Sequence, residues 1–325
     1  TTTFAYDGND RLLITTGPLS GVSQRSYTPR GRLQTLTDPN NNTHTFGYDS
    51  RARLTSITDP LGHLWTTTYD EEGIVTSHTD PLLHTTTFAS DTMGRITGTT
   101  SPLGHTARVG DDSMGRVSRL TDALGATTVL SRDARGLLSG IALPGGTIAT
   151  AYERNALGQI TRITDPRGRE WGRAYDTMGR ATSFTDPLGN IETTAYDNRH
   201  RPKTITFPGE LGTRTNTYDP GGNLTKATYS DGTTYEYSYD ANKRLTAATG
   251  LTLDYDANGS ITNSNGIGIM RDAGRRITSV TFAPGKSITY EYDANDRLTK
   301  VTDWVGGSTS FTYDDAGRLT TITRP

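Results

Sequence analysis

Three histidines spaced 21 residues apart are the first candidates for chemistry. His63, His84 and His105 occupy one phase of the sequence, and imidazole nitrogens are common zinc ligands. On a β-ribbon, residues one such period apart would lie two strands apart, at about 9.6 Å. Zinc needs its nitrogens at about 2.1 Å, so neighbours in this row cannot share an ion. We interpret the three as surface residues that follow a turn, and we predict no metal site.

Acidic residues are the second candidates, because paired carboxylates can perform general acid and base catalysis. Adjacent pairs occur at Glu71-Glu72, Asp111-Asp112 and Asp314-Asp315, among 35 acidic residues. Most aspartates, however, recur at two turn positions, where a carboxylate accepts backbone hydrogen bonds. Glycine-rich stretches such as residues 209–212 match no phosphate-binding loop. We therefore predict no catalytic residue and no cofactor.

Rows of arginine and tyrosine permit two interpretations. Arg180 and its equivalents follow a turn at one phase, and Tyr175 and its equivalents begin each period. The two rows could bind an acidic ligand or stack against sugars. Alternatively, each arginine pairs with a nearby aspartate or tyrosine ring, and the rings pack across strands. We favour the second interpretation.

The elements that would position these residues form one repeat, which residues 175–195 represent. Asp176 to Gly179 and Asp186 to Gly189 are turn signals, and Pro187 presets φ in the second of them. Sixteen copies begin at residues 6, 27, 48, 69, 90, 111, 132, 154, 175, 196, 218, 239, 255, 271, 292 and 313. A fixed period of this kind indicates a repeat architecture.

The residues between the turns predict an all-β protein of roughly 30 short antiparallel strands, two per copy. Such a sheet is too wide to stay flat, so we expect it to wind into a spiral or a barrel-like wall. Leu54 and Ile57 would point to opposite faces unless a bulge intervenes, and we expect both faces to be moderately apolar. Two copies, from Tyr239 and Tyr255, are only 16 residues long and predict shorter hairpins.

Composition sets further limits. The chain has 325 residues, a net charge of -2, no cysteine and a mean hydropathy of -0.59. The near-zero charge argues against bulk attraction to nucleic acid or anionic membrane, and no apolar run approaches the roughly 20 residues of a membrane span. The repeat runs from end to end, so we predict one domain over residues 1–325 and expect it to be an excerpt of a longer array.

The repeat motif resembles that of the Rhs family, whose members carry YD repeats. Two stretches show it best, residues 313–320 (YDDAGRLT) and residues 58–62 (TDPLG). The structural repeat positions that match it are Tyr48, Asp49, Asp59, Pro60, Gly62, Tyr175, Asp176, Gly179, Arg180, Asp186, Pro187, Gly189, Tyr313, Asp314, Gly317 and Arg318. In that family the repeats spiral into a hollow shell, as in bacterial Rhs toxins, the cocoon of insecticidal toxin complexes and the related shell of teneurins.

The resemblance implies a container without catalytic function. We expect a shell segment that encloses a C-terminal toxin or effector domain, in a protein that is secreted or exported. Its expected partners are the remainder of the shell and the cargo, with edge-to-edge self-association, and neither nucleic acid nor a membrane. The aspartyl self-cleavage of bacterial members carries over to no residue here. The alternative is an extracellular binding module for carbohydrate or another cell-surface ligand.

Overall fold

The chain is almost entirely β-structure, as the sequence predicts. A computed structural model describes residues 1–146 and 149–325, and within them it contains 32 strands and one short 3-10 helix, η1 (Gly209–Leu211). The chain forms two compact units. Unit 1 comprises Thr1–His105 and Ser238–Pro325, and unit 2 comprises Thr106–Tyr237. The repeat runs through both units, and a single array over residues 1–325 stays a prediction.

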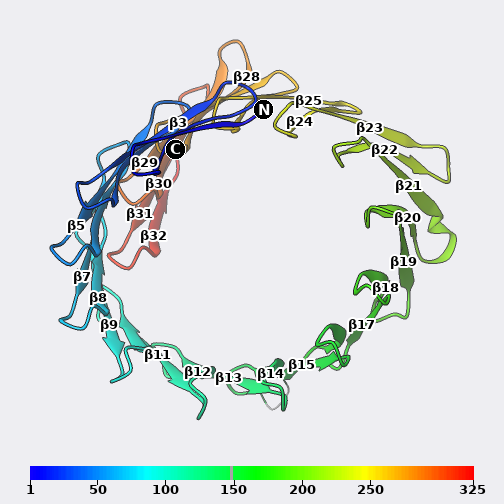
Figure 1. Cartoon of the computed structure of the whole chain (residues 1–325), viewed down its shortest axis with the longest axis horizontal. Helices are drawn as coiled ribbons and strands as arrows, with labels where there is room; N and C mark the ends of the chain where they lie inside the picture. Colours follow the sequence, from blue (N-terminus) through cyan, green and yellow to red (C-terminus); the bar gives the residue numbers. More distant parts are fainter. Residues whose placement is uncertain (147–148) are drawn as a thin grey trace. The chain divides into compact units, whose positions relative to one another are not determined.

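Consecutive strands lie next to one another in chain order within each unit (Figure 1). The first segment of unit 1 contains β1 (Thr3–Tyr6), β2 (Leu12–Thr16), β3 (Val22–Tyr27), β4 (Leu33–Thr37), β5 (Thr43–Tyr48), β6 (Leu54–Thr58), β7 (Leu64–Tyr69), β8 (Val75–Thr79), β9 (Thr85–Ser90) and β10 (Ile96–Thr100). Its second segment contains β24 (Leu245–Ala248), β25 (Leu251–Tyr255), β26 (Ile261–Ser264), β27 (Ile267–Arg271), β28 (Ile277–Ala283), β29 (Lys286–Tyr292), β30 (Leu298–Thr302), β31 (Ser308–Tyr313) and β32 (Leu319–Thr323).

Unit 2 follows the same plan, and its strands alternate between six and five residues as far as residue 206. It contains β11 (Thr106–Asp111), β12 (Val117–Thr121), β13 (Thr127–Arg132), β14 (Leu138–Ala142), β15 (Ala149–Arg154), β16 (Ile160–Thr164), β17 (Glu170–Tyr175), β18 (Ala181–Thr185), β19 (Ile191–Tyr196), β20 (Pro202–Thr206), β21 (Thr213–Tyr218) and β22 (Leu224–Tyr229), and β23 (Thr234–Tyr239) ends just past its boundary. The pairings are antiparallel, for example β17 with β18 and β18 with β19.

A β-bulge after the first turn of the repeat decides which side chains share a face. In the β5–β6 hairpin, Tyr48 pairs with Leu54 but Gly47 pairs with Ser56, so Thr55 is the extra residue. Because of this bulge, Leu54 and Ile57 lie on the same face, together with Tyr48. The same register shift recurs in other hairpins that the first turn closes, for example before Tyr27, Tyr175 and Tyr313, whereas the hairpin β6–β7, which the second turn closes, has a regular register.

The expectation of two moderately apolar faces is therefore wrong. One face carries Tyr48, Leu54, Ile57 and their equivalents, and the opposite face carries a ladder of hydroxyl groups, with occasional exposed apolar residues such as Leu64 and Ile191. In that ladder Ser26 Oγ lies 2.6 Å from Thr35 Oγ1, and Thr37 Oγ1 lies 2.8 Å from Thr43 Oγ1. Cross-strand hydroxyl pairs stabilise a sheet without requiring an apolar layer over it.

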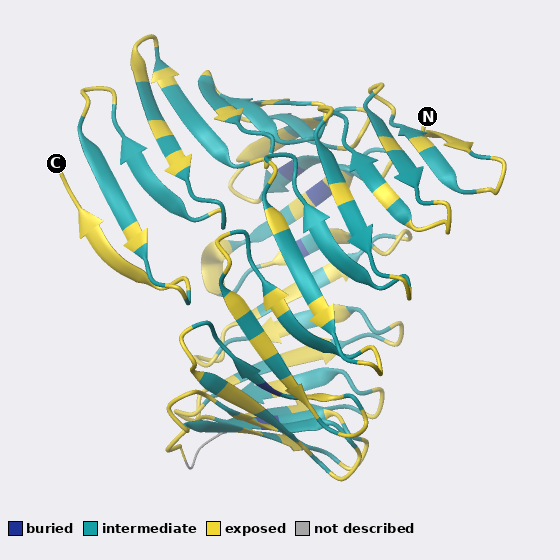
Figure 2. Ribbon diagram, turned by 90° about the vertical axis from the view of Figure 1, so that its left-hand side faces the viewer, coloured by how far each residue is buried: buried dark blue, intermediate teal, exposed yellow. Residues whose placement is uncertain are grey.

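The strands have little buried core. Ile205, Ala227 and Asn216 are the buried side chains larger than glycine among the described residues. Figure 2 shows strands of intermediate exposure, with exposed residues concentrated at the turns. Stability must therefore come from turns and strand pairing repeated many times. No helix in the described part of the chain is long and apolar enough to cross a membrane.

The two 16-residue copies form shorter hairpins, as the sequence predicts. β24 and β25 are joined by Thr249-Gly250, and β26 and β27 are joined by Asn265-Gly266. Asn265 and Gly266 have φ angles of 50° and 85°, which are the left-handed values that a two-residue hairpin turn requires. These copies keep two strands each, so the strand count per repeat is unchanged.

Candidate functional site

The first turn of the repeat is held by one aspartate. Asp176 Oδ1 accepts the backbone N–H groups of Met178 and Arg180, each at 2.9 Å. Asp176 Oδ2 accepts Nε of Arg180 at 2.7 Å. The Gly179 N–H donates to the Asp176 carbonyl at 3.0 Å, and Gly179 has a φ of 81°. One carboxylate thus satisfies backbone donors and orients the arginine that follows.

The second turn repeats this arrangement with proline at its second position. Asp186 Oδ1 accepts the N–H groups of Leu188 and Asn190, at 2.8 and 2.9 Å. Asn190 Nδ2 donates to Asp186 Oδ2 at 2.8 Å, where the first turn uses an arginine. Pro187 occupies a position whose N–H the turn does not need. Gly189 closes the turn at a φ of 83°.

The other predicted repeat positions occupy equivalent places. Asp49 and Asp314 accept Nε of Arg53 and Arg318, at 2.6 and 2.7 Å. Asp59 accepts the N–H of His63 at 2.7 Å, in the turn that contains Pro60 and Gly62. Gly62 and Gly317 have φ angles of 86° and 78°. Each of these side chains contributes to a turn of its own repeat.

The tyrosines tie each repeat to the preceding one. Tyr175 donates its hydroxyl to the carbonyl of Ile160 at 2.7 Å, and Tyr48 and Tyr313 do the same to Leu33 and Leu298. The accepting residue lies 15 positions back and begins the return strand of the preceding hairpin. The sequence predicts rings that pack across strands, but it does not reveal this hydrogen bond, whose partners are distant in sequence.

Tyr175→Phe is expected to lower the free energy of unfolding by about 0.5–1.5 kcal/mol, because the ring remains while one hydrogen bond is lost. Urea denaturation of unmodified protein and variant measures the difference. Tyr235→Phe is the matched control, since Tyr235 is 42% exposed and contacts Tyr229 through its ring. Equal losses in the two variants would contradict a special role for the repeated hydroxyl.

The arginine after the first turn joins two repeats. The guanidinium of Arg180 binds Asp176 of its own turn and lies 4.6 Å from the ring centroid of Tyr196 in the next repeat. Arg53 lies 4.7 Å from the Tyr69 ring and also donates Nη1 to the Asp70 carbonyl at 2.8 Å. We call this aspartate, arginine and following tyrosine the clasp. These contacts agree with the sequence-based interpretation that the arginines pair with a nearby aspartate and a tyrosine ring.

In some repeats an arginine occupies the position of the first tyrosine and donates an equivalent hydrogen bond to the preceding repeat. Arg132 donates Nη2 to the Val117 carbonyl at 3.1 Å, and Arg154 donates Nη2 to the Leu138 carbonyl at 3.2 Å. These carbonyls begin the return strand of the preceding hairpin, as in the tyrosine copies. The repeat therefore needs a donor of this reach at this position, and the phase of the sequence would identify such arginines.

The turn arginines lower the pKa of the turn carboxylates. The backbone amide of Arg116, followed by its side chain, lowers the pKa of Asp112 from 3.8 to about 2. Arg201 lowers the pKa of Asp197 to about 2 in the same way. A carboxyl group with a lowered pKa is a weak base, which suits a permanent hydrogen-bond acceptor rather than a catalyst that exchanges protons near neutral pH.

The three histidines of the predicted row each contact their own turn. Nδ1 of His63 lies 3.1 Å from Asp59 Oδ2, and Nδ1 of His84 lies 3.1 Å from Asp80 Oδ2. The N–H of His105 donates to Ser101 Oγ at 3.2 Å. Each of these contacts lies within one turn, so the row does not converge on a common point.

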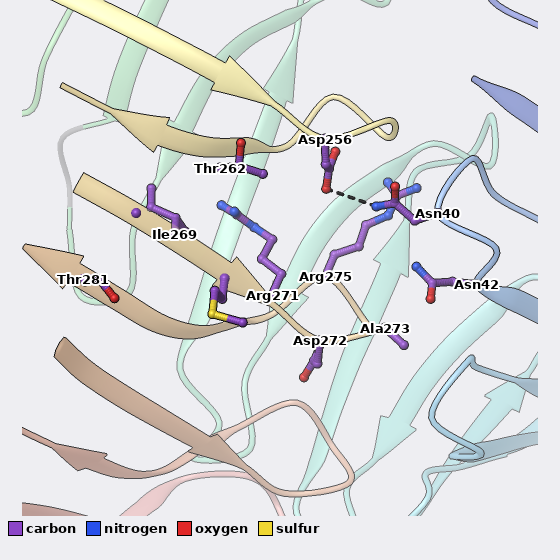
Figure 3. Close-up of a pocket in the computed structure, with 12 residues that line it drawn as sticks. Asn40, Asn42, Asp256, Thr262, Ile269, Arg271, Asp272, Ala273, Arg275 and Thr281 are labelled. Carbon is purple, nitrogen blue, oxygen red and sulfur yellow. Dashed lines mark hydrogen bonds between the residues drawn. The ribbon is translucent and has the colours of Figure 1, made fainter. Parts of the chain in front are cut away.

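A groove of about 640 Å³ lies in unit 1 (Figure 3). Asn40 and Asn42 of the first segment and Asp256, Arg271 and Arg275 of the second line it. Its polar side chains make hydrogen bonds within the protein. Asn40 Nδ2 donates to Asp256 Oδ2 at 3.1 Å, and Arg271 Nη1 donates to the Ile261 carbonyl at 2.7 Å. We assign no ligand to the groove, because its polar groups already have protein partners.

Comparison with known families and structures gives consistent results. The RHS Repeat family model matches residues 27–63, 48–85, 154–191, 218–252 and 272–308, which together cover just over half of the chain. No curated protein sequence matches the chain significantly.

Solved structures share the fold. A crystal structure of TcdB2-TccC3-TEV aligns with a TM-score of 0.71 at 15% identity, over 99% of this chain and 22% of that one. A structure of the Photorhabdus luminescens Tc holotoxin pore aligns with a TM-score of 0.61 at 16% identity, over 99% of this chain and 21% of that one. The chain therefore spans about a fifth of these proteins, and at such identities the likeness establishes the fold alone.

Proposed function

Because the chain belongs to the RHS repeat family, we propose that it is a wall segment of a β-shell that encloses a C-terminal toxin or effector domain. In this proposal, residues 1–325 are one run of a longer spiral array, in a protein that is exported. The partners are the rest of the shell and the enclosed domain. The segment itself catalyses no reaction, and it isolates its cargo by enclosure.

The commitment of the repeated polar side chains to the wall itself carries this proposal. Asp176 spends both carboxylate oxygens on its turn, Arg180 joins two repeats, and Tyr175 binds the preceding one. Side chains that would recognise a sugar or an acidic ligand, arginine and tyrosine, are the ones occupied in this way. This use favours a container over a carbohydrate-binding surface.

Protection of the cargo from protease tests the proposal. In the full-length protein that contains this chain, the enclosed domain is expected to resist added protease while the wall is intact. Gly179→Val combined with Gly189→Val should make it cleavable, because both glycines have positive φ angles that valine does not tolerate.

His105→Ala is the matched control, because His105 is exposed and contacts its turn through its backbone. Equal cleavage of the enclosed domain in unmodified and Gly→Val proteins would contradict enclosure. Specific binding of the isolated chain to a glycan array would favour the binding-module alternative, and turnover of a substrate would contradict a non-catalytic wall.

A further inference from the structure

Within unit 1, second turns of the first segment contact first turns of the second segment. Asn258 Nδ2 donates to Asp38 Oδ2 at 2.6 Å, and Asn295 Nδ2 donates to Asp80 Oδ2. Between these contacts, a Cβ placed on Gly274 would lie 3.0 Å from Cδ1 of Leu61. We call these turn-to-turn contacts the seam. Each successive repeat of the first segment faces the next successive repeat of the second segment, although the residues that meet are more than 200 positions apart in the sequence.

The first turns that form the seam contain small residues. Residues 256–258 and 293–295 read Asp-Ala-Asn, and residues 272–274 read Asp-Ala-Gly. Most other first turns carry a long side chain at the third position, namely Arg30, Arg51, Glu72, Met93, Met114, Arg135, Leu157, Met178 and Arg199. Asn9, Gly221, Asn242 and Ala316 are the other small residues there. Asn242 shares a cavity with Gly17 and Leu19, and Ala316 shares one with Pro102, so these two turns also lie near second turns of the first segment. An asparagine amide is short enough to reach the facing carboxylate, whereas methionine or arginine would fill the space that the facing turn occupies.

The long side chains have a different use at the edge of the sheet. Arg135 donates Nη1 to the carbonyls of Asn155 and Ala156 in the neighbouring turn, at 3.2 and 3.0 Å. Arg30 reaches the Ser50 carbonyl in the same way, at 2.5 Å. Met93 and Met178 are exposed. First turns therefore fall into two classes, those that bridge along their own edge or stay exposed and those that face a second edge.

Two of the facing second turns present a leucine, Leu61 and Leu82, whereas the turn at Asp38 has Asn40 at this position. Leu82 and Leu103, on the seam side of unit 1, are 36% and 37% exposed, and Pro102 shares a cavity with Asn295 and Ala316 of the second segment. In unit 2 the same turn position holds Leu124 and Leu188, which are 95% and 87% exposed. The position, the turn and the residue type are the same, so the difference measures what a facing turn covers.

We propose that the third residue of the first turn decides which repeats stack edge to edge. Turns that read Asp-Ala-Asn or Asp-Ala-Gly dock onto second turns that begin Asp-Pro. The asparagine amide donates to the carboxylate of the facing turn, and the glycine accommodates the facing leucine. The second turns at Leu124 and Leu188 are then a docking surface for a further run of Asp-Ala-Asn turns in a YD-repeat segment. This rule concerns the wall alone, so it can fail or hold independently of any enclosed cargo.

The seam is tested with an engineered cysteine pair in the full chain, which contains no native cysteine. Leu61→Cys and Gly274→Cys report the proximity of the two segments by their rate of oxidative cross-linking. Adding Asn258→Met and Asn295→Met, which installs a side chain of the other class, is expected to slow cross-linking about tenfold or more, because two amide–carboxylate bonds are lost.

Asn9→Met is the matched control, since it makes the same change in a first turn outside the seam contacts and should leave the cross-linking rate unchanged. If Asn258→Met with Asn295→Met cross-links as fast as the control, the third residue does not decide stacking and the rule is overturned.

The docking surface is tested by adding docking turns to the same chain. Leu157→Asn, together with Thr177→Ala and Met178→Asn, converts two first turns of unit 2 to Asp-Ala-Asn or Asn-Ala-Asn. Sedimentation velocity is expected to show concentration-dependent association of this variant beyond that of the unmodified chain. Adding Leu124→Asp and Leu188→Asp should abolish the gain. A variant that associates no more than the unmodified chain, or a gain that survives the two Leu→Asp changes, overturns the assignment of this surface.

Discussion

Gly189→Val is expected to lower the free energy of unfolding by about 1–3 kcal/mol, because it forces a β-branched residue into a left-handed conformation. Gly189 has a φ of 83°, and no heavy atom lies within 4 Å of the Cβ that a substitution would add. The loss would therefore come from backbone strain and not from a clash. Thermal and urea unfolding of the variant measure it.

Gly189→Asn is the matched control, because asparagine adopts positive φ angles at a smaller cost. The chain itself supports this distinction. Residues other than glycine have positive φ at Asp10, Ser20, Asn41, Ala52, Leu83, His200, Lys243, Asn265, Arg275 and Asp296. None of these ten is β-branched. A loss for Gly189→Asn as large as that for Gly189→Val would contradict the strain argument.

Local chemistry explains why the turns could be predicted from the sequence. Asp176 and Gly179 act within five residues, and their preferences do not depend on what the rest of the chain does. The same holds for Asn265-Gly266, whose dipeptide selects its hairpin turn. The all-β fold was then predictable, because the same turn and strand residues recur in phase from copy to copy.

The two faces of the sheet could not be predicted, because they depend on register. Leu54 and Ile57 are three residues apart, which places them on opposite faces of a regular strand. The bulge at Thr55 reverses that conclusion, and it is defined by pairing with Gly47 and Tyr48 in the partner strand. The signal that could have indicated a bulge is the recurrence, in many copies, of two apolar residues three positions apart, as Leu54 and Ile57 are.

The seam lay further beyond sequence reasoning. Asn258 meets Asp38 across 220 residues, and neither residue type is unusual for a turn. Only the contrast between Asn258 or Asn295 and the long residue at the same position, such as Met178, carries information. That contrast has a meaning once the structure shows which turns face one another.

Acidification is expected to unfold the chain cooperatively over a narrow range, because many turn carboxylates act in the same direction. The pKa of Asp7, Asp112 and Asp197 is lowered from 3.8 to about 2 by hydrogen bonds from the arginine four residues on. Hydrogen bonds from the corresponding arginine, four residues on in each case, also lower the pKa of Asp49, Asp91, Asp176 and Asp314. A carboxyl group with a lowered folded-state pKa stabilises the fold above its unfolded-state pKa, and this stability is lost as pH falls through the folded-state value.

The melting temperature should therefore change little from pH 7 to about pH 5 and then fall steeply between about pH 4 and pH 2. The chain supplies its own uncharged control. Asn155 Oδ1 accepts the N–H groups of Leu157 and Gln159, and Asn155 Nδ2 donates to Gln159 Oε1 at 2.8 Å, so this turn makes the same bonds without a carboxylate.

Copying that pair elsewhere, as Asp112→Asn with Arg116→Gln and Asp197→Asn with Arg201→Gln, should make the fall in melting temperature below pH 4 shallower. Arg201 also lies over the Tyr218 ring. Loss of that contact lowers the melting temperature equally at every pH. The steepness of the fall in melting temperature below pH 4 therefore reports the carboxylates alone. If the melting temperature of the fourfold variant falls with pH as steeply as that of the unmodified chain, the acid sensitivity comes from groups other than these turn carboxylates.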